Sequence, residues 1–323
     1  NQEITGSNTL VKADVKNGEK ATGKGSLVGA EYTLFHADGT PVTWSETAKA
    51  KLTGGEKVAK SVINGKEVDN GDNVVIKVTD ASKLNVGVER LALGTYYWKE
   101  TNAPEGYIID GAQHSFTVVK KDDKTTTVKS DDTKSVETPI VARLNMQKLL
   151  EGNGTNPTAL SGGNDIAFTV KPLKGTNAEE KHFTTGIKDD DDGFGTVDLE
   201  YGDWVLTEDD APAGFEKIDP IYIHMSYDAK TDLYTITASN NEDGLKPFST
   251  RTFSQSDDSK EKNANAKGTL AGTLTSQNST ISLSKITAVD KQTPPPTFEP
   301  HKFDVTGKGQ DIQGESLLDD DSE

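Results

Sequence analysis

Two glutamates in this chain are each predicted to lie on the apolar face of a strand. Tyr-Tyr-Trp-Lys-Glu-Thr-Asn-Ala-Pro-Glu-Gly-Tyr at 96–107 and Asp-Trp-Val-Leu-Thr-Glu-Asp-Asp-Ala-Pro-Ala-Gly-Phe at 203–215 are two copies of one motif. Because side chains alternate along a strand, Glu100 shares a face with a tyrosine and a tryptophan, and Glu208 with a tryptophan and a leucine. A buried carboxyl group is tolerated only when it is paired or when it stays protonated.

A lysine accompanies each glutamate. Lys12 and Lys148 stand at the start of the same two units, each on the apolar face of its own strand. Such a pair can form a buried salt bridge, which contributes little net stability. It can also react, because burial lowers the pKa of an amine and raises that of an acid, by up to about 3–5 units, leaving an uncharged nucleophile beside a proton donor. With a side-chain amide or acid on a neighbouring strand as the electrophile, the product is an isopeptide bond, formed once.

Short alternating strands are predicted to position these residues. In the first part of the chain they fall at 8–15, 27–35, 73–79 and 114–119, and turns rich in Gly, Asp and Asn separate them. With 32% hydrophobic and 7% aromatic residues, the chain suits thin sandwich cores better than a large α/β enzyme. We therefore predict an all-β protein of antiparallel sandwiches.

The order of elements then repeats, with strands at 142–150, 160–170, 195–199 and 221–225 in the places of the earlier ones. The two copies differ in loop length, whereas the repeats of a short-period solenoid are regular. Two related domains in tandem are therefore the simplest explanation.

The predicted domain boundaries follow from this repeat. The first domain takes residues 1–138, and the second takes 139–293 with a long loop at 245–279. Residues 294–323 are predicted to be a Pro-rich extended linker and the truncated start of a further domain.

The composition argues against several classes of partner. The chain has 52 Asp and Glu against 35 Lys and Arg, a formal net charge of −17 that opposes binding to nucleic acid or to an anionic membrane. It contains no cysteine and no apolar run long enough to span a bilayer. The five histidines are scattered, and the acidic run at 189–192 has Lys188 where a calcium loop needs an acid, so we expect no metal and no cofactor.

The order of motifs resembles the B-type (CnaB-like) domains of Gram-positive collagen adhesins and pilins. The residues that carry the resemblance are Leu-Val-Lys-Ala-Asp at 10–14, Leu-Val-Gly-Ala-Glu-Tyr at 27–32 and Lys-Glu-Thr-Asn-Ala-Pro-Glu-Gly-Tyr at 99–107. The second copy is looser, with Gly-Gly-Asn for Gly-Ala and Glu-Asp-Asp for Glu-Thr. The resemblance implies immunoglobulin-like sandwiches that cross-link themselves. Lys12 and Lys148 would then be the nucleophiles, and Glu100 and Glu208 the catalytic acids.

The resemblance also places an acceptor on the last strand of each domain. In the second domain Asp290 fits, with Asn240 or Asn241 as the alternative. In the first domain Glu137 occupies the expected position, and the nearest asparagine, Asn145, is only three residues from the second lysine. Either Asn145 closes the first domain, or that domain has no bond.

We expect an extracellular, wall-attached stalk segment of a Gram-positive adhesin or minor pilin, present here as a monomeric fragment or mature product. It would not be an enzyme beyond its single self-cross-linking step. The family implies sortase, the cell wall or pilus neighbours and a host surface ligand as partners. Two alternatives are a matrix- or carbohydrate-binding module that uses the loops at 40–72 and 245–279, and accessory domains of a secreted carbohydrate-active enzyme.

Overall fold

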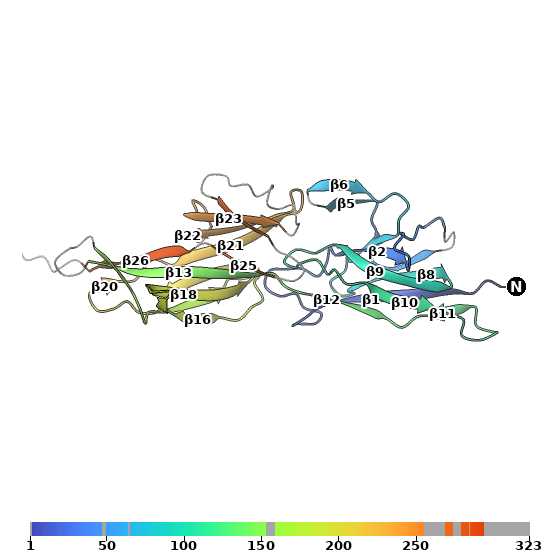
Figure 1. The fold of residues 1–323 in the computed structure, drawn as a ribbon, viewed down its shortest axis with the longest axis horizontal. Coiled ribbons are helices and arrows are strands. Elements are labelled where there is room, and N and C mark those ends of the chain that lie inside the picture. The colour runs from blue at the N-terminus through green and yellow to red at the C-terminus, as the bar shows by residue number, and fades with distance from the viewer. Residues whose placement is uncertain are drawn as a thin grey trace, which may run out of the picture.

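The computed structural model describes residues 2–46, 50–63, 65–152, 159–254, 269–273, 279–283 and 285–293, and these form an all-β protein. No helix occurs within those ranges, so none is available there to cross a membrane. The linker and further domain that we predicted for 294–323 lie outside the described residues. Figure 1 shows two β-sandwiches arranged end to end, with the N-terminus at the far end of the first.

The strands of the first sandwich alternate with tight turns. They are β1 (Thr5–Asp14), β2 (Glu31–His36), β3 (Lys51–Gly54), β4 (Glu56–Lys57), β5 (Lys60–Ile63), β6 (Lys66–Asp69), β7 (Val75–Lys77), β8 (Asn85–Ala92), β9 (Gly94–Asn102), β10 (His114–Val118), β11 (Thr127–Lys129) and β12 (Thr133–Glu137). One sheet has the order β11-β1-β8-β3, with β12 also paired to β1, and the facing sheet has the order β10-β9-β2-β7-β4. The hairpin β5-β6 stands apart.

The second sandwich repeats this plan with more strands in each sheet. They are β13 (Val141–Glu151), β14 (Leu160–Gly162), β15 (Ala167–Pro172), β16 (Lys181–Thr184), β17 (Gly186–Lys188), β18 (Asp191–Glu200), β19 (Asp203–Glu208), β20 (Phe215–Glu216), β21 (Ile221–Asp228), β22 (Leu233–Ser239), β23 (Ser249–Ser254), β24 (Thr269–Thr273), β25 (Thr280–Ser282) and β26 (Ile286–Gln292). The orders are β17-β18-β13-β26-β20 and β16-β15-β19-β21-β22-β23-β24, with β14 and β25 also paired to β13.

The first and last strands of each sandwich lie side by side and parallel. β1 pairs with β12, and β13 pairs with β26, although each pair is separated by most of its domain in sequence. The glutamate strands β9 and β19 lie in the opposite sheets, next to β2 and β15. Apolar residues from the two sheets fill the space between them, and they form one buried cluster in each sandwich.

The segment that we predicted to be a long loop at 245–279 is not all loop. It contains β23, which continues the second sheet beyond β22, and β24, which pairs with β23 in parallel. The prediction was wrong here because the sequence Ser-Thr-Arg-Thr-Phe-Ser is mostly polar, and only Phe253 reaches the core, where it stacks on Tyr234 with ring centroids 5.1 Å apart. A strand next to the edge strand of a sheet can form with little apolar sequence of its own when its backbone pairs on both sides.

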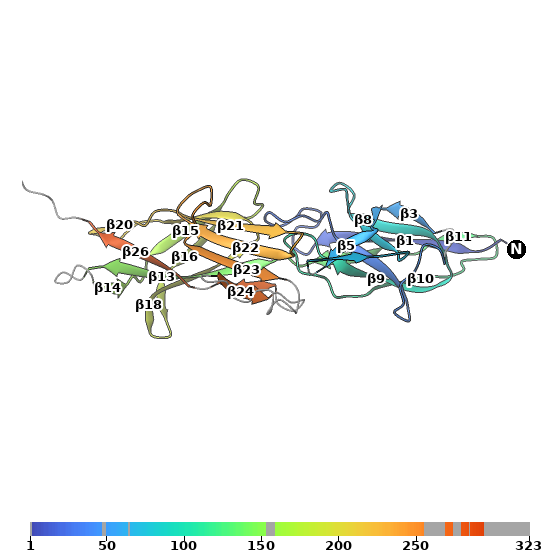
Figure 2. The same cartoon turned by 90° about the horizontal axis from the view of Figure 1, so that it is seen from above.

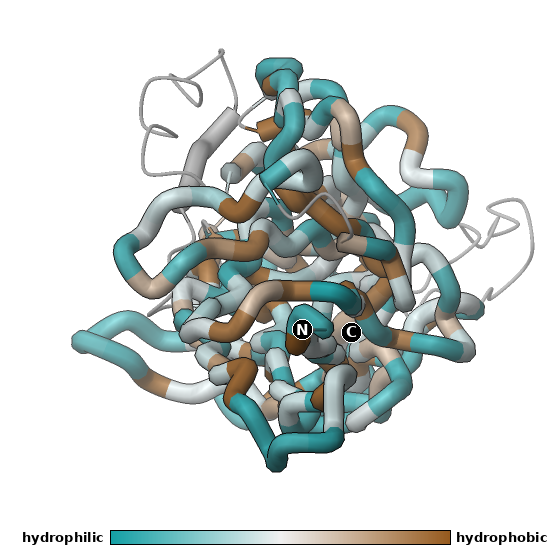
Figure 3. The backbone as a smooth tube through the Cα atoms, turned by 90° about the vertical axis from the view of Figure 1, so that its right-hand side faces the viewer, coloured by the Kyte–Doolittle hydropathy of each residue, from teal (hydrophilic) through white to brown (hydrophobic). Residues whose placement is uncertain are grey.

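Backbone hydrogen bonds join the two sandwiches at their junction. Gly23 and Asn177 exchange them at 2.8 and 2.7 Å, and the Gly106 N–H donates to the Tyr234 hydroxyl at 2.8 Å. The Lys24 ammonium lies 3.1 Å from Asp203 across the same junction. Both side views show the two bodies following one long axis (Figures 1 and 2), and in the end-on view hydrophilic residues predominate at the outer turns (Figure 3).

Gly23 tests how much the junction holds the two domains in line. Its φ is 64°, and a Cβ there would lie 2.0 Å from the Tyr201 carbonyl oxygen, so Gly23→Ala should separate the domains locally. Gly18 is a matched control, because its φ is 66° and a Cβ there meets nothing within 4 Å.

Both substitutions carry a similar backbone cost of about 1 kcal/mol, but only Gly23→Ala should broaden the distribution of distances between spin labels on the two domains. Equal distributions in both variants would show that these contacts do not align the domains.

Candidate functional site

The second sandwich buries a lysine between two acids; we call Lys148, Glu208 and Asp290 the second site. They come from β13, β19 and β26, and the side chains of all three are fully excluded from solvent. The Lys148 Nζ lies 2.5 Å from Asp290 Oδ1 and 3.6 Å from Glu208 Oε1, and it donates to the Leu149 carbonyl oxygen at 3.1 Å. The structure therefore brings together the predicted nucleophile, acid and acceptor of this domain.

The first sandwich contains the corresponding group of Lys12, Glu100 and Glu137, which we call the first site. The Lys12 Nζ donates to Glu100 Oε2 at 3.2 Å and is in close contact with Glu137 Oε1. The side chains of all three are again fully buried. Lys12 and Glu100 thus meet as predicted.

Strand register shows that the two sites are equivalent. Lys12 lies opposite Ser135 in the parallel pair of β1 and β12, and Lys148 lies opposite Ala288 in the pair of β13 and β26. In each case the acid that meets the lysine is two residues further along the last strand. Period-two alternation places that acid on the same face as the residue opposite the lysine.

The glutamates are equivalent as well. Glu100 accepts a hydrogen bond at 2.7 Å from the backbone N–H of Asp110, and Glu208 accepts one at 3.5 Å from that of Ile218, each ten residues further along the chain. Each glutamate is also held by a neighbouring strand of its own sheet, since Glu100 pairs in register with Tyr32 and Glu208 with Phe168. The local sequence therefore fixes the glutamates in the same way in both domains.

Both glutamates hold a proton more tightly than an exposed carboxyl group does. Burial raises the pKa of Glu100 well above its ordinary value; the Lys12 charge lowers it in part, and Glu137 raises it further. Burial, together with a hydrogen bond to Asp290, raises the pKa of Glu208 to about 7 against the opposing charge of Lys148. A protonated glutamate leaves one carboxylate to balance one ammonium in each site.

That protonation state is one proton transfer from a reactive one. If the ammonium gives its proton to the neighbouring carboxylate, the site holds an amine and two carboxylic acids, with no charge to solvate in a dry interior. The amine can then attack the adjacent carbonyl carbon, while the glutamic acid donates a hydrogen bond to the carbonyl oxygen and passes a proton to the departing water. Packing holds the reacting groups in contact throughout.

Buried carboxyl oxygens without hydrogen-bond donors are consistent with the same reaction. As carboxylate oxygens, Glu137 Oε2, Glu208 Oε2 and Asp290 Oδ2 are buried and find no hydrogen-bond donor among the described residues, whereas Asp290 Oδ1 is held by its ion pair with Lys148. Leaving such oxygens unpaired costs about 1–3 kcal/mol each. Condensation with the lysine removes one oxygen of the acceptor as water, so it relieves this cost as well as the charge.

The two sites differ in the residues that surround them. In the first site, the Tyr32 hydroxyl donates to Ser135 at 2.7 Å, Ser135 donates to Asp110 at 3.0 Å, and His114 Nε2 lies 2.6 Å from Asp110. These contacts form an unbroken chain from the buried lysine, which donates to Tyr32 at 3.2 Å, to the partly exposed histidine.

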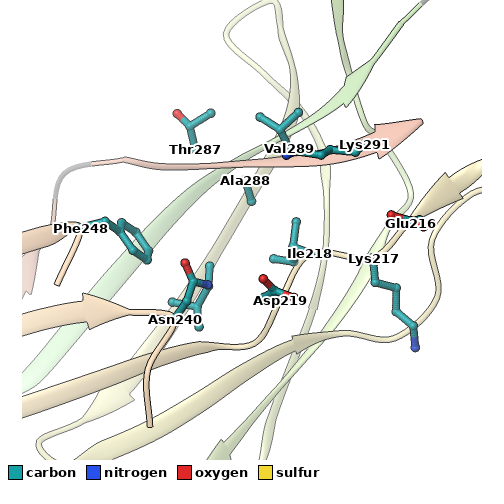
Figure 4. Close-up of a pocket in the computed structure, with 11 residues that line it drawn as sticks. Glu216, Lys217, Ile218, Asp219, Asn240, Phe248, Thr287, Ala288, Val289 and Lys291 are labelled. Carbon is teal, nitrogen blue, oxygen red and sulfur yellow. The ribbon is translucent and has the colours of Figure 1, made fainter. Parts of the chain in front are cut away.

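Apolar residues take the same positions in the second site. Phe168 and Ala288 replace the tyrosine and the serine, because they stand opposite Glu208 and Lys148 in register. Ile218 and Ile221 likewise replace the aspartate and the histidine. Figure 4 shows Ile218 and Ala288 lining a pocket beside β26 with polar residues at its rim, including Asn240 and Lys291.

The alternative acceptors do not reach either lysine. Asn240 lies at the rim of that pocket and donates to the Pro220 carbonyl oxygen at 3.0 Å, and Asn241 donates to that of Leu245 at 2.8 Å. Asn145 is also misplaced for the role that we considered. Its amide donates to Ser282 Oγ at 3.1 Å and to the Leu283 carbonyl oxygen at 2.8 Å, both in the second sandwich.

The structure therefore does not bring Asn145 to Lys12. Asn145 stands an odd number of residues from Lys148 on the same strand, so it projects from the opposite face of β13. Glu137 lies where that acceptor was sought. Across the described residues, no cluster of His, Asp and Glu side chains is arranged to hold a metal ion.

Comparison with known proteins gives one family match, in the first domain. Residues 9–134 match the family model described as SpaA: Prealbumin-like fold domain. No curated protein sequence matches the chain.

Several solved structures are similar at low identity. The C-terminal fragment of the pilus adhesin SpaC from Lactobacillus rhamnosus GG is 15% identical with a TM-score of 0.41, covering 92% of this chain and 100% of that one. The Bacillus anthracis TIE protein is 15% identical with a TM-score of 0.41; the alignment covers 90% of this chain but only 34% of the TIE chain. GBS52, the minor pilin of Streptococcus agalactiae, is 13% identical with a TM-score of 0.25, covering 91% and 99%.

His114 tests the polar chain beside the first site. Burial alone would raise the pKa of Asp110, but hydrogen bonds from His114, from the backbone of Ala112 and from Ser135 outweigh it and hold the pKa below its ordinary 3.8. His114→Leu should therefore destabilise β10 and β12 by about 1–3 kcal/mol, because it leaves the half-buried carboxylate short of a donor.

The readout is amide hydrogen exchange of those strands. Since a lowered pKa stabilises the fold above the unfolded value, the effect should be full at neutral pH and fade as acid protonates Asp110. His182→Leu, at an exposed histidine paired with Glu180, should have no such effect. Equal changes in the two variants would contradict the role of the chain.

Proposed function

We propose that this chain is a stalk segment of a Gram-positive surface adhesin or minor pilin, and that an isopeptide bond between Lys148 and Asp290 braces its second domain. Glu208 acts as the catalytic acid. The observation that carries the proposal is a fully buried lysine held between two acids, repeated in both domains at the same register. The SpaA-type first domain supports the pilus context.

The position of the bond suits a protein under tension. The chain enters the second domain at β13 and leaves it at β26, and Lys148 and Asp290 join these two strands. Pulling force therefore passes through the new bond and bypasses residues 149–289. The domain between them need not resist unfolding by hydrogen bonds alone.

The bond also replaces a missing disulfide. The chain contains no cysteine. Closing a loop of more than about 100 residues constrains the unfolded chain by roughly 5 kcal/mol in the loop-entropy account. An amide, unlike a disulfide, is not reversed by reducing agents, so it holds in any redox environment outside the cell.

The working environment that we propose is the bacterial surface. There the chain would lie between the cell wall or pilus neighbours on one side and a host surface ligand on the other, after attachment by a sortase. The end-to-end arrangement in Figure 1 suits a spacer between such partners. It is not an enzyme, since its chemistry changes only itself and occurs once.

Glu208→Ala tests the catalytic acid by intact mass in denaturant. The wild-type second domain should be lighter than its formula by one water, and the variant should regain that mass, because without the acid the carbonyl group is not polarised. Asp210→Ala, at an exposed carboxylate in the following turn, should keep the loss. A variant of Glu208 that still loses water would refute the role assigned to this residue.

The pH dependence of bond formation follows from the pKa of about 7 for Glu208. The reactive site needs the proton of this acid, so the rate should fall about tenfold for each pH unit above that value. The rate is measured by mass after light removes a photolabile cage from Lys148 in the folded chain. Glu208→Gln cannot lose a proton, so its slower rate should not change across the same range. A rate that rises through neutral pH in the wild type would contradict this assignment.

A further inference from the structure

Glu137 occupies the place in the first domain that Asp290 occupies in the second. Both stand two residues beyond the residue that lies opposite the lysine in a parallel pair of first and last strands. Both are fully buried. The register therefore brings to the lysine the glutamate that the sequence places at the expected acceptor position, where an asparagine or an aspartate was expected.

The longer side chain reaches the lysine and is held there. Glu137 Oε1 is in close contact with the Lys12 Nζ and lies 3.3 Å from the Tyr32 hydroxyl oxygen. That hydroxyl also contacts Ser135 at 2.7 Å on the same strand as the glutamate. In the second site Phe168 and Ala288 stand in these two positions, and the acceptor there is the shorter aspartate.

The charges in the first site balance in the same way as those in the second site. Lys12 is the cation and Glu100 the acid held in its protonated form, so Glu137 is left to balance the lysine. Its second oxygen, Oε2, is buried without a donor among the described residues. A permanent ion pair would keep that oxygen unsatisfied, whereas condensation can remove it.

We infer that the first domain is cross-linked through a glutamate, by an amide between the Lys12 Nζ and the Glu137 side-chain carboxyl carbon. This rests on the proposed function for its type of reaction. The C–N bond forms as one C–O bond of Glu137 breaks, the Lys12 ammonium gives up two of its three protons, and the carboxylate oxygen leaves with them as water. Glu100 carries the proton between nitrogen and leaving oxygen, and the Tyr32 hydroxyl hydrogen-bonds the carbonyl oxygen that remains. No oxidant or other reagent is consumed.

The chain offers a direct readout of this bond in a tryptic digest of the denatured wild-type protein. An acylated Lys12 resists trypsin, so residues 1–16 should appear joined to residues 135–143 with the loss of one water. Glu137 is the only side-chain acid or amide in Ser-Val-Glu-Thr-Pro-Ile-Val-Ala-Arg, so the branch point is unambiguous. The second domain provides an internal reference, in which residues 144–174 join Ile-Thr-Ala-Val-Asp-Lys at 286–291.

The outcomes separate this inference from the proposed function. Detection of both branched peptides supports the glutamate link in the first domain and the proposed bond in the second. The second branched peptide alone, with residues 1–12 and 135–143 released unmodified, overturns the glutamate link and leaves the Lys148–Asp290 bond standing. If neither branched peptide is detected, both the Lys12–Glu137 bond and the Lys148–Asp290 bond are overturned. Because the test uses the wild-type protein, it does not depend on a variant that folds.

Glu137→Ala gives a second test of the acceptor. In the folded variant Lys12 should become free, so trypsin should now release residues 1–12 while the branched peptide of the second domain persists. Asp132→Ala, at an exposed carboxylate on the turn before β12, is the matched control and should keep both branches. A Lys12 that remains acylated in Glu137→Ala would show that another residue is its acceptor.

Discussion

The structure depends on burying an amine together with two carboxyl groups. An isolated charge in a protein interior is costly, and even a paired one returns little, so a sandwich of this size gains nothing by placing Lys12 or Lys148 in its core for stability alone. The arrangement becomes favourable when the charges can be removed. In the reaction that we propose, a proton on each glutamate and then a condensation turn a costly ion cluster into a neutral amide.

The fold supplies the geometry for this chemistry through one pairing. In both domains the first strand lies parallel to the last, and the glutamate strand faces them from the other sheet. The lysine, the acceptor and the acid therefore come from three elements that are far apart in sequence and rigid in the fold. The pairing also sets the mechanical role, since the strands that would be joined are those through which the chain enters and leaves.

The two domains bury the same kind of cluster, a lysine with two acids, among different neighbouring residues. The first site is extended by polar side chains, from Tyr32 through Ser135 to Asp110 and His114, whereas the second is enclosed by Phe168, Ala288 and isoleucines. The polar chain accompanies the longer acceptor, whose carboxyl group it helps to hold. The two domains share the buried lysine and acids and differ in the residues that surround them.

Much of this was predictable from local patterns. Period-two alternation located Lys12, Glu100, Lys148 and Glu208, because the side-chain direction along a strand depends only on the neighbouring residues. The contact between Lys12 and Glu137 was not predicted, although Glu137 stood at the expected position, because strand pairing over such a sequence separation leaves no local signal. Strand β8 was missed for another reason: Gly87 and the positive φ of Arg90 (65°) interrupt its pattern, although it lies at the centre of its sheet.

A crystal structure of the chain at atomic resolution tests the central claim most directly, through the separation between the Lys148 Nζ and the Asp290 side-chain carboxyl carbon. Our account predicts continuous density and a separation of about 1.3 Å, that of an amide C–N bond. Separate groups, with nitrogen and oxygen about 2.8 Å apart as in an ordinary charged hydrogen bond, would contradict it.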